Sequence, residues 1–264
     1  MTAPGVDPDL LRTARMTRFL GVSPEVHESL GSTNDEAFRR AEEGAPQGLI
    51  VLTGHQTSGK GRLGRVWFDQ PGKSLMFSIL LRPPIPVPSY PLLSLALASS
   101  AAWIARDMLK NVTVKWPNDV LYGGKKLCGV LAESRTLTLG QPPALVLGIG
   151  MNVNYRERDF PEELRDTATS LAIASGEDDI EMGFLLSGIL NHFTAELSVA
   201  YNGGPDALLD LLRPQLPEPG ARVRIRLADR IVEGELVELI DTGALRVRDG
   251  RTDAVETLTA GVME

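Results

Sequence analysis

Two glycine-rich stretches carry the residues best suited to chemistry in this chain. The first, Gly54–Phe68 (GHQTSGKGRLGRVWF), sets Lys60, Arg62 and Arg65 among glycines. The second, Val114–Ser134 (VKWPNDVLYGGKKLCGVLAES), joins a Trp-Pro-Asn-Asp turn to an apolar strand that opens with a lysine. Glycine lets backbone N–H groups approach an anion closely, and fixed cations add charge that backbone dipoles lack. Together they indicate a site for a negatively charged small molecule.

Two better-known phosphate-binding patterns do not fit these stretches. Gly59–Gly64 (GKGRLG) formally matches G-x-G-x-x-G, but a dinucleotide fold needs a following helix and an acid about twenty residues later. A strand is predicted there instead, and no Asp or Glu occurs between Asp69 and Asp107. Gly72-Lys73-Ser74 is similar to the end of a P-loop, but Trp67 stands where its first glycine belongs. We reject both interpretations.

Single residues in these stretches have ordinary structural explanations. Trp67 and Trp116 suit core packing or stacking, and a lone lysine such as Lys126 is usually a surface residue. Cys128 has apolar neighbours and no histidine nearby in sequence, so we expect it to be buried and unreactive. Asp119 suits a cap for the turn that precedes it. Only the conjunction and order of these residues favour a functional site.

Composition excludes several classes of function. The net charge of −7 argues against non-specific nucleic-acid binding, which needs a basic surface. The single cysteine excludes an internal disulfide and suits a reducing cytoplasm, and the three histidines lack metal-ligand spacing. No signal-peptide pattern opens the chain, and the apolar tract Leu92–Ile104 is too short to cross a bilayer. We expect a cytoplasmic protein with no nucleic-acid or membrane partner and no metal held by side chains alone.

Hydrophobic periodicity and turn residues predict the elements that position these stretches. A hydroxyl cap followed by acids predicts a helix that begins at Ser32 and runs to Glu43. Further helices are predicted at residues 7–20, Tyr90–Lys110, Ile180–Ala200 and Asp206–Leu212. Strands are predicted at Val26–Ser29, Leu49–Thr53, Ser74–Leu81, Val112–Lys115, Val120–Tyr122, Lys126–Thr138 and Ala144–Val153.

The pattern changes at Pro214–Gly220 (PQLPEPG), which is typical of a linker. Beyond it, apolar and polar residues alternate between short turns, which predicts a small antiparallel β-barrel of roughly five strands. We therefore divide the chain into a larger N-terminal domain, residues 1–216, and a small C-terminal domain, residues 217–264.

Five motifs in order resemble the biotin–protein ligase family, of the type without an N-terminal DNA-binding domain. They are Ser32-Thr33-Asn34, Gln56–Arg65, Lys115–Asp119, Lys126–Gly129 and Gly148–Asn154. The resemblance implies an α+β fold: a mixed-sheet, class II synthetase-like catalytic domain with a small C-terminal SH3-like β-barrel. It also implies a reaction in which ATP activates biotin as biotinyl-5′-AMP, which then passes to one lysine of a biotin carboxyl carrier domain.

The resemblance assigns roles to individual residues. For biotin, neutral donors and acceptors are expected to pair the ureido ring; the biotin set is Ser32, Thr33, Asn34, Gln56, Gly59, Lys60, Gly61, Arg62, Lys126 and Gly129. The ATP set is Arg62, Arg65, Trp67, Asn118, Asp119, Lys126 and Asn152, and Mg²⁺ accompanies the triphosphate. The catalytic set is Lys126, Arg62 and Asp119. Lys126 bridges the biotin carboxylate and the α-phosphate, and Asp119 receives a proton from the incoming lysine.

One departure from the family pattern is Lys60, since that loop usually reads Gly-Arg-Gly-Arg. Lysine keeps the charge but loses the fork geometry of arginine. We therefore expect Lys60→Arg to slow release of the adenylate.

Two other functions stay open from the sequence. A lipoate–protein ligase would share the fold and chemistry, although its pocket would not need the polar set of Ser32–Asn34 and Gln56. A non-catalytic metabolite-sensing adaptor or regulator is disfavoured by the acidic balance and by the lack of room for a DNA-reading module before Ser32. The sequence does not decide the carrier protein, the order of substrate binding or the oligomeric state, although the family often forms homodimers.

Overall fold

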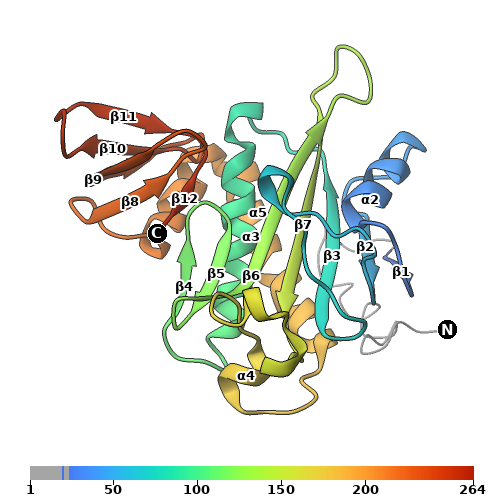
Figure 1. Ribbon diagram of the computed structural model, residues 1–264. Coiled ribbons are helices and arrows are strands. Elements are labelled where there is room, and N and C mark those ends of the chain that lie inside the picture. The colour runs from blue at the N-terminus through green and yellow to red at the C-terminus, as the bar shows by residue number, and fades with distance from the viewer. Residues whose placement is uncertain (1–19, 21–23) are drawn as a thin grey trace.

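A central mixed sheet organises the larger part of the molecule (Figure 1). The computed structural model describes residue 20 and residues 24–264, so most of the helix predicted at residues 7–20 lies outside the described residues. The sheet has seven strands: β1 (Glu25–His27), β2 (Ile50–Thr53), β3 (Ser74–Leu81), β4 (Val112–Lys115), β5 (Asp119–Tyr122), β6 (Lys125–Arg135) and β7 (Ala144–Asn152). Their order is β1-β2-β3-β7-β6-β5-β4, and β1 pairs parallel with β2 while the other pairs are antiparallel. The predicted mixed α+β sheet is confirmed.

Helices cover the two faces of this sheet unequally. On one face, α2 (Thr33–Glu42) packs Phe38 and its neighbours against β2, β3 and β7. On the other face, α3 (Tyr90–Ala105) and α5 (Met182–Leu212) lie together behind the strands (Figure 1). Residue Gly204 is non-helical and Pro205 follows, so α5 is interrupted where two helices were predicted. The shorter helices are α4 (Leu171–Ser175) and the 3₁₀ turns at Arg62–Gly64, Val87–Ser89, Glu157–Asp159, Glu162–Leu164 and Arg213–Gln215.

Strand β7 shows how the sequence separates a packed face from a functional face. Side chains alternate across a strand, so Leu147, Ile149 and Met151 point to the face covered by α3 and α5. The intervening residues Gly148, Gly150 and Asn152 point to the α2 face. The two glycines leave that face hollow, and the cavity described below occupies the space.

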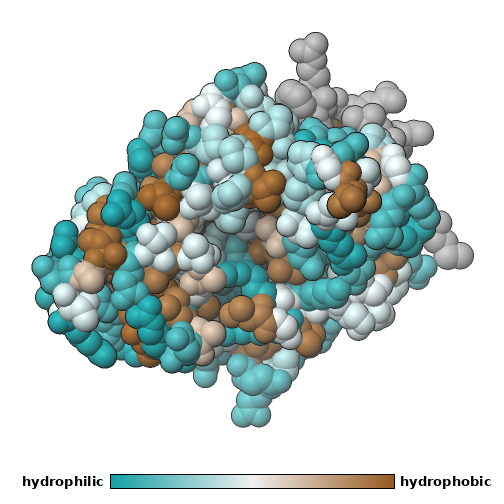
Figure 2. All heavy atoms as spheres, turned by 90° about the horizontal axis from the view of Figure 1, so that it is seen from above, coloured by the Kyte–Doolittle hydropathy of each residue, from teal (hydrophilic) through white to brown (hydrophobic). Residues whose placement is uncertain are grey.

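Among the described residues, one helical segment is long and apolar enough by composition to cross a membrane: Val87–Ala105, which joins a 3₁₀ turn to α3, and 78% of its most apolar stretch is buried inside the protein. It ends at Ala105, earlier than the predicted Lys110, because the chain turns there and Asn111 adopts φ 62° before β4. On the molecular face in Figure 2, hydrophobic side chains lie in small groups among hydrophilic ones. That distribution is ordinary for a globular protein surface.

The C-terminal residues form a second, antiparallel sheet. Its strands are β8 (Arg222–Arg226), β9 (Ile231–Leu239), β10 (Leu245–Asp249), β11 (Val255–Leu258) and β12 (Val262–Met263), in the order β11-β10-β9-β8-β12. The predicted small antiparallel, SH3-like C-terminal domain is confirmed; its five strands form a sheet that does not close into a barrel. Strand β12 has two residues and pairs with β8, while β11 ends the opposite edge. The division at residues 216 and 217 stays a prediction.

Trp116 ties the two sheets together. Its indole Nε1 donates a 2.9 Å hydrogen bond to the carbonyl oxygen of Gly243, in the turn between β9 and β10, and the side chain is buried.

We expect Trp116→Phe to lower the free energy of unfolding by about 1–3 kcal/mol, because that buried carbonyl loses its donor. Urea unfolding followed by circular dichroism measures the change. The control is Trp103→Phe on α3, since Trp103 is 48% exposed; an equal loss in both variants would contradict the prediction.

Candidate active site

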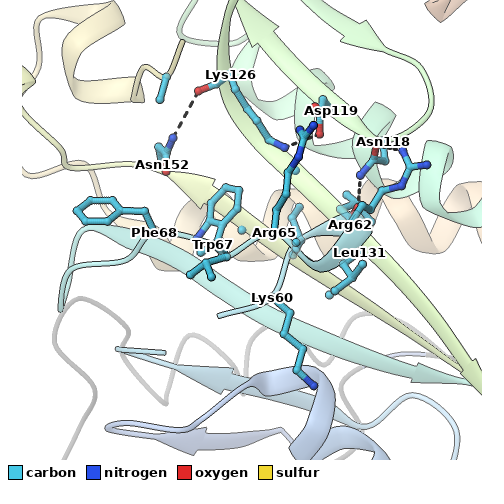
Figure 3. Close-up of a pocket in the computed structure, with 18 of the residues that line it drawn as sticks. Lys60, Arg62, Arg65, Trp67, Phe68, Asn118, Asp119, Lys126, Leu131 and Asn152 are labelled. Atoms are coloured by element: carbon cyan, nitrogen blue, oxygen red, sulfur yellow. Dashed lines mark hydrogen bonds and ion pairs between the residues drawn. The ribbon is translucent and has the colours of Figure 1, made fainter. Parts of the chain in front are cut away.

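A cavity of about 540 Å³ lies on the α2 face of the central sheet. The predicted site residues converge on it from α2, the glycine-rich loop and strands β5, β6 and β7 (Figure 3). Those that line it are Ser32, Thr33, Asn34, Gln56, Lys60, Gly61, Arg62, Arg65, Trp67, Asn118, Asp119, Lys126, Gly129 and Asn152. Gly59 is the exception: a Cβ there would lie 2.8 Å from the Trp67 carbonyl oxygen, so Gly59 allows the loop to fold back on itself.

Glycines on adjacent strands form the floor of the cavity. Cross-strand neighbours run through β3, β7, β6 and β5 in one row: Met76, Gly150, Gly129 and Asp119. A Cβ on Gly150 would lie 2.6 Å from the Trp67 ring, so the ring rests directly on the backbone of β7. A Cβ on Gly129 would lie 2.8 Å from both Cε and Nζ of Lys126. The floor therefore holds the two large side chains that were predicted to handle the nucleotide.

Opposite charges meet at one end of the cavity. The Nζ of Lys126 lies 2.7 Å from Oδ1 of Asp119, and both side chains are half-buried. Lys126 Nζ also lies 5.7 Å from the centre of the Trp67 ring, within range of a cation–π contact. The ammonium is thus fixed in position before any ligand arrives.

Arginine side chains from the loop complete this charged end. Arg62 Nη1 donates to Oδ1 of Asn118 at 2.9 Å. Burial lowers the pKa of the Arg62 guanidinium, with Asp119 acting in the opposite direction, yet arginine stays protonated. Among the described residues, Arg65 and Lys115 line the cavity without an ion-pair partner. Lys115 was missed by sequence reasoning, although it opens the Lys-Trp-Pro-Asn-Asp motif.

Neutral polar groups gather at the other end. Thr33 N donates to Oε1 of Gln56 at 2.8 Å. The buried Ser78 hydroxyl lies 2.7 Å from Oγ1 of Thr33 and 2.6 Å from Oδ1 of Asn34. A Cβ on Gly148 would lie 2.1 Å from that same Asn34 oxygen. Ser78 and Gly148 were not predicted as site residues. Each is a small residue in an otherwise apolar strand, β3 or β7, and that pattern could have identified them.

The buried carboxylate of Asp69 holds the backbone of Gln56 in place. Its side chain is fully buried, and Oδ2 accepts from the Gln56 backbone N at 3.0 Å and lies 2.8 Å from Nδ1 of His55. Tyr155 OH donates to Oδ1 of Asp69 at 3.4 Å, and burial raises the pKa of Tyr155 to about 12. This network fixes the start of the glycine-rich loop.

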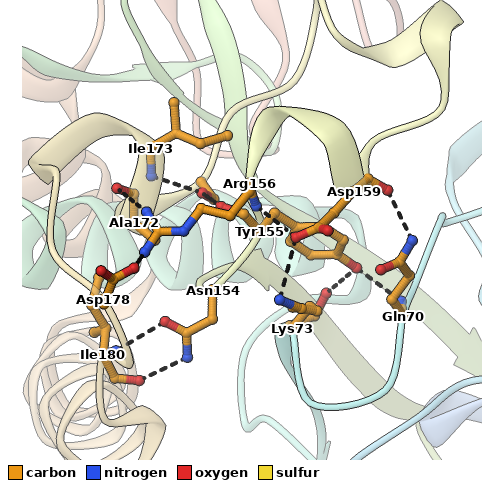
Figure 4. Close-up of polar contacts among 12 residues, drawn as sticks. Gln70, Lys73, Asn154, Tyr155, Arg156, Asp159, Ala172, Ile173, Asp178 and Ile180 are labelled. Carbon is orange, nitrogen blue, oxygen red and sulfur yellow. Dashed lines mark hydrogen bonds and ion pairs between the residues drawn. The ribbon is translucent and has the colours of Figure 1, made fainter.

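A long connection after β7 closes the side of the cavity, and polar contacts anchor it (Figure 4). Lys73 Nζ lies 3.2 Å from Oδ2 of Asp159, and Gln70 Nε2 donates to the Asp159 carbonyl oxygen at 2.9 Å. Further along, Thr167 accepts from the Lys126 backbone N at 2.7 Å, and Thr169 N donates back to the Lys126 carbonyl at 2.9 Å. The backbone of the key lysine is therefore held on both sides.

Asn152 braces this arrangement from β7. Its buried Nδ2 donates to the carbonyl of Thr169 at 2.9 Å and to that of Lys126 at 3.4 Å. For the reaction that the resemblance implies, we expect Asn152→Ala to slow adenylate formation about tenfold, because losing a buried hydrogen bond to these carbonyls loosens the Lys126 backbone. Biotin-dependent pyrophosphate release in single turnover measures the rate. Asn202→Ala, at an exposed position on α5, is the control, and an unchanged rate in Asn152→Ala would contradict the bracing role.

The ammonium of Lys60 lies apart from the other cations of the cavity. Its ammonium points away from the cavity toward α2 (Figure 3), where Nζ lies 2.6 Å from Oδ1 of Asp35. Lys60 is nevertheless one of the residues that line the cavity. Contact of its ammonium with biotin therefore stays a prediction.

Two other groups prove structural. Cys128 is buried, and burial raises the pKa of its thiol, as expected for a packing residue. Glu25, His27 and Glu36 place possible metal-ligand atoms within 4.8 Å of one another. Arg40 pairs with both carboxylates, at 2.8 Å and 3.1 Å, so this cluster is built as a salt-bridge network.

Comparison with known proteins identifies the family. Residues 26–152 match the model of the biotin/lipoate A/B protein ligase family. The chain is 34% identical over 242 residues to the bifunctional ligase/repressor BirA of Bacillus subtilis, covering 89% of this chain and 72% of that protein. It is 33% identical over 228 residues to the biotin–[acetyl-CoA-carboxylase] ligase of Mycobacterium tuberculosis, covering 84% of this chain and 81% of that protein. The chain therefore belongs to the biotin/lipoate A/B protein ligase family.

A solved structure narrows this assignment. The biotin protein ligase of Aquifex aeolicus, in complex with biotin and ATP, superposes with a TM-score of 0.74 at 27% identity, covering 92% of this chain and 98% of that one. Within its family, this chain groups with the biotin–protein ligases.

Proposed function

We propose that this chain is an ATP-dependent biotin–protein ligase that forms biotinyl-5′-AMP and transfers biotin to a lysine of a biotin carboxyl carrier domain. One observation carries the proposal: a single cavity joins neutral hydrogen-bonding groups at one end to Lys126, Arg62 and Arg65 at the other. A ureido ring needs the first set, and a carboxylate reacting with a triphosphate needs the second.

In the first step, a carboxylate oxygen of biotin attacks the α-phosphorus of ATP, and the bond from that phosphorus to pyrophosphate breaks. Both reactants are anions, so charge repulsion is the main obstacle. Lys126, already held by Asp119 and by its own backbone contacts, offers a cation that needs no reorganisation. Arg65 and Lys115 are placed to hold phosphate oxygens, since no carboxylate among the described residues pairs with them.

In the second step, the amine of the acceptor lysine attacks the acyl carbon, and AMP leaves with the bonding electrons. The amine must lose a proton to a nearby base. Asp119 lines the cavity beside Lys126 and is our candidate for that base. Oδ1 of Asp119 pairs with Lys126, so the other carboxylate oxygen is the one proposed to accept the proton.

Mg²⁺ is proposed to enter with the triphosphate, whose oxygens suit a hard cation that keeps much of its water. Of the carboxylates that line the cavity, Asp119 is paired with Lys126, and Asp166 belongs to the connection between β7 and α4. We expect no dedicated protein cage for the metal.

The decisive experiment is incubation with biotin, Mg-ATP and an isolated acceptor domain, followed by intact-mass measurement of the acceptor. The expected result is the addition of one biotinyl group, with pyrophosphate released when biotin and ATP are present. Failure to release pyrophosphate with either biotin or lipoate would contradict the ligase and favour the sensor alternative. Parallel reactions with lipoate distinguish the other ligase; the relatives and the biotin-bound neighbour favour biotin.

Two further expectations accompany this proposal. The cytoplasm is the proposed compartment, because ATP and carrier domains must both be present. A homodimer that forms through the central sheet would use one of the edge strands among the described residues, β1 or β4, and light scattering of the purified protein checks it.

A further inference from the structure

The glycine-rich loop forms a flap over the cavity, residues 59–67. Its two arms are joined by hydrogen bonds from Gly61 N to the Arg65 carbonyl, at 2.7 Å, and from Trp67 N to the Gly59 carbonyl, at 2.9 Å. Leu63 at the tip is 68% exposed and Val66 is 82% exposed, although both lie at the cavity. Apolar burial therefore contributes little to holding the tip of the flap in place.

Polar side chains fasten the flap to opposite walls. On one side, Arg62 donates to Asn118, and its Nη1 lies 3.5 Å from the Gly261 carbonyl of the C-terminal sheet. On the other side, Lys60 reaches across to Asp35 on α2, with 2.6 Å between Nζ and Oδ1 (Figure 3). Each wall thus contributes one attachment.

The α2 attachment is built on a rigid base. Asp35 directly follows Asn34, whose buried side chain is held by Ser78 and by Glu133, at 2.8 Å from Nδ2 to Oε2. Arg135 also approaches Asp35, at 3.4 Å, but its guanidinium lies 4.0 Å over the Phe38 ring. Lys60 is the nearer partner and the one carried by the flap.

We propose that the Asp35–Lys60 ion pair is a latch that keeps the flap closed and so retains the adenylate until the acceptor lysine arrives. The inference rests on the proposed function, and both residues act as positioning residues. The two side chains are 44% and 42% exposed. An exposed pair of this kind contributes little, so its loss should speed adenylate release about two- to five-fold and not more.

The test measures formation and release separately. Enzyme loaded with labelled biotin and Mg-ATP is freed of small molecules and then chased with unlabelled biotin, and the label that stays bound is followed over time. The variants are Asp35→Asn, Lys60→Gln, the double variant, and the exchanged pair Asp35→Lys with Lys60→Asp. Lys60→Arg, which can pair with Asp35 through two nitrogens, should slow release. Glu42→Gln removes an exposed charge from the same helix and is the control.

We expect both single variants to release adenylate about two- to five-fold faster, the double variant to release it no faster than either, and the exchanged pair to recover much of the loss. The rate of pyrophosphate release should stay near that of the unmodified enzyme in Asp35→Asn, because Asp35 does not line the cavity. Release from Asp35→Asn at the original rate, or effects of the single variants that add, would overturn the latch while leaving the ligase intact. Absence of pyrophosphate release in the unmodified enzyme would instead overturn the proposed function and the latch with it.

Discussion

Replacement of Lys126 by alanine is expected to reduce adenylate formation by about 10²–10³-fold, since a preorganised cation opposite a developing negative charge contributes on that scale. The Lys126 ammonium lies 2.7 Å from Asp119, and it packs over Gly129, where a Cβ would lie 2.8 Å from Nζ. Its loss leaves the carboxylate and the α-phosphate to repel one another. Biotin-dependent pyrophosphate release in single turnover measures the effect.

The neighbouring lysine supplies a matched control. Lys125 donates from Nζ to the Arg165 carbonyl oxygen at 2.7 Å and does not line the cavity. Lys125→Ala removes the same charge from the same strand and should leave the rate within about twofold, because exposed charges act weakly at a distance. Similar losses in the two variants would show that overall charge matters and that the position of Lys126 does not.

Gly148→Ala is expected to raise the KM for biotin about tenfold or more while leaving the KM for ATP nearly unchanged. The new methyl group would meet Oδ1 of Asn34 at 2.1 Å and its Cγ at 2.9 Å. Asn34 cannot yield freely, because it is bonded to Ser78 and Glu133. Losing even one such bond at a desolvated site costs about 1–3 kcal/mol, which corresponds to about 5- to 150-fold in affinity.

Steady-state kinetics with each substrate varied in turn measures the two KM values. The control is Gly31→Ala, where an added Cβ has no atom within 4 Å and φ is not in the left-handed region. Because Gly31 lies just before Ser32, this variant tests whether any methyl near the site is harmful. Equal changes in the two KM values of Gly148→Ala would point to general disruption of the sheet instead.

Local sequence was enough to define the strands and most of the candidate site. Strand β3 falls at the predicted Ser74–Leu81, and β4 at Val112–Lys115, because apolar runs between turn residues have few other stable conformations. Of the predicted residues that line the cavity, all but Trp67 belong to the five motifs. The charge and hydrogen-bonding capacity of these side chains follow from residue type alone, so the sequence was enough to identify them.

Contacts between distant residues required the folded chain. Asn34 and Glu133 form a hydrogen bond although they are far apart in the sequence, and only the structure shows that Gly148 leaves room for the Asn34 side chain. The sequence gives no indication that the ammonium of Lys60 pairs with Asp35. The edge of the C-terminal sheet likewise depends on how far β12 runs beside β8. Residue type and periodicity determine which groups are present and on which face, but only packing decides which of them come within hydrogen-bonding distance.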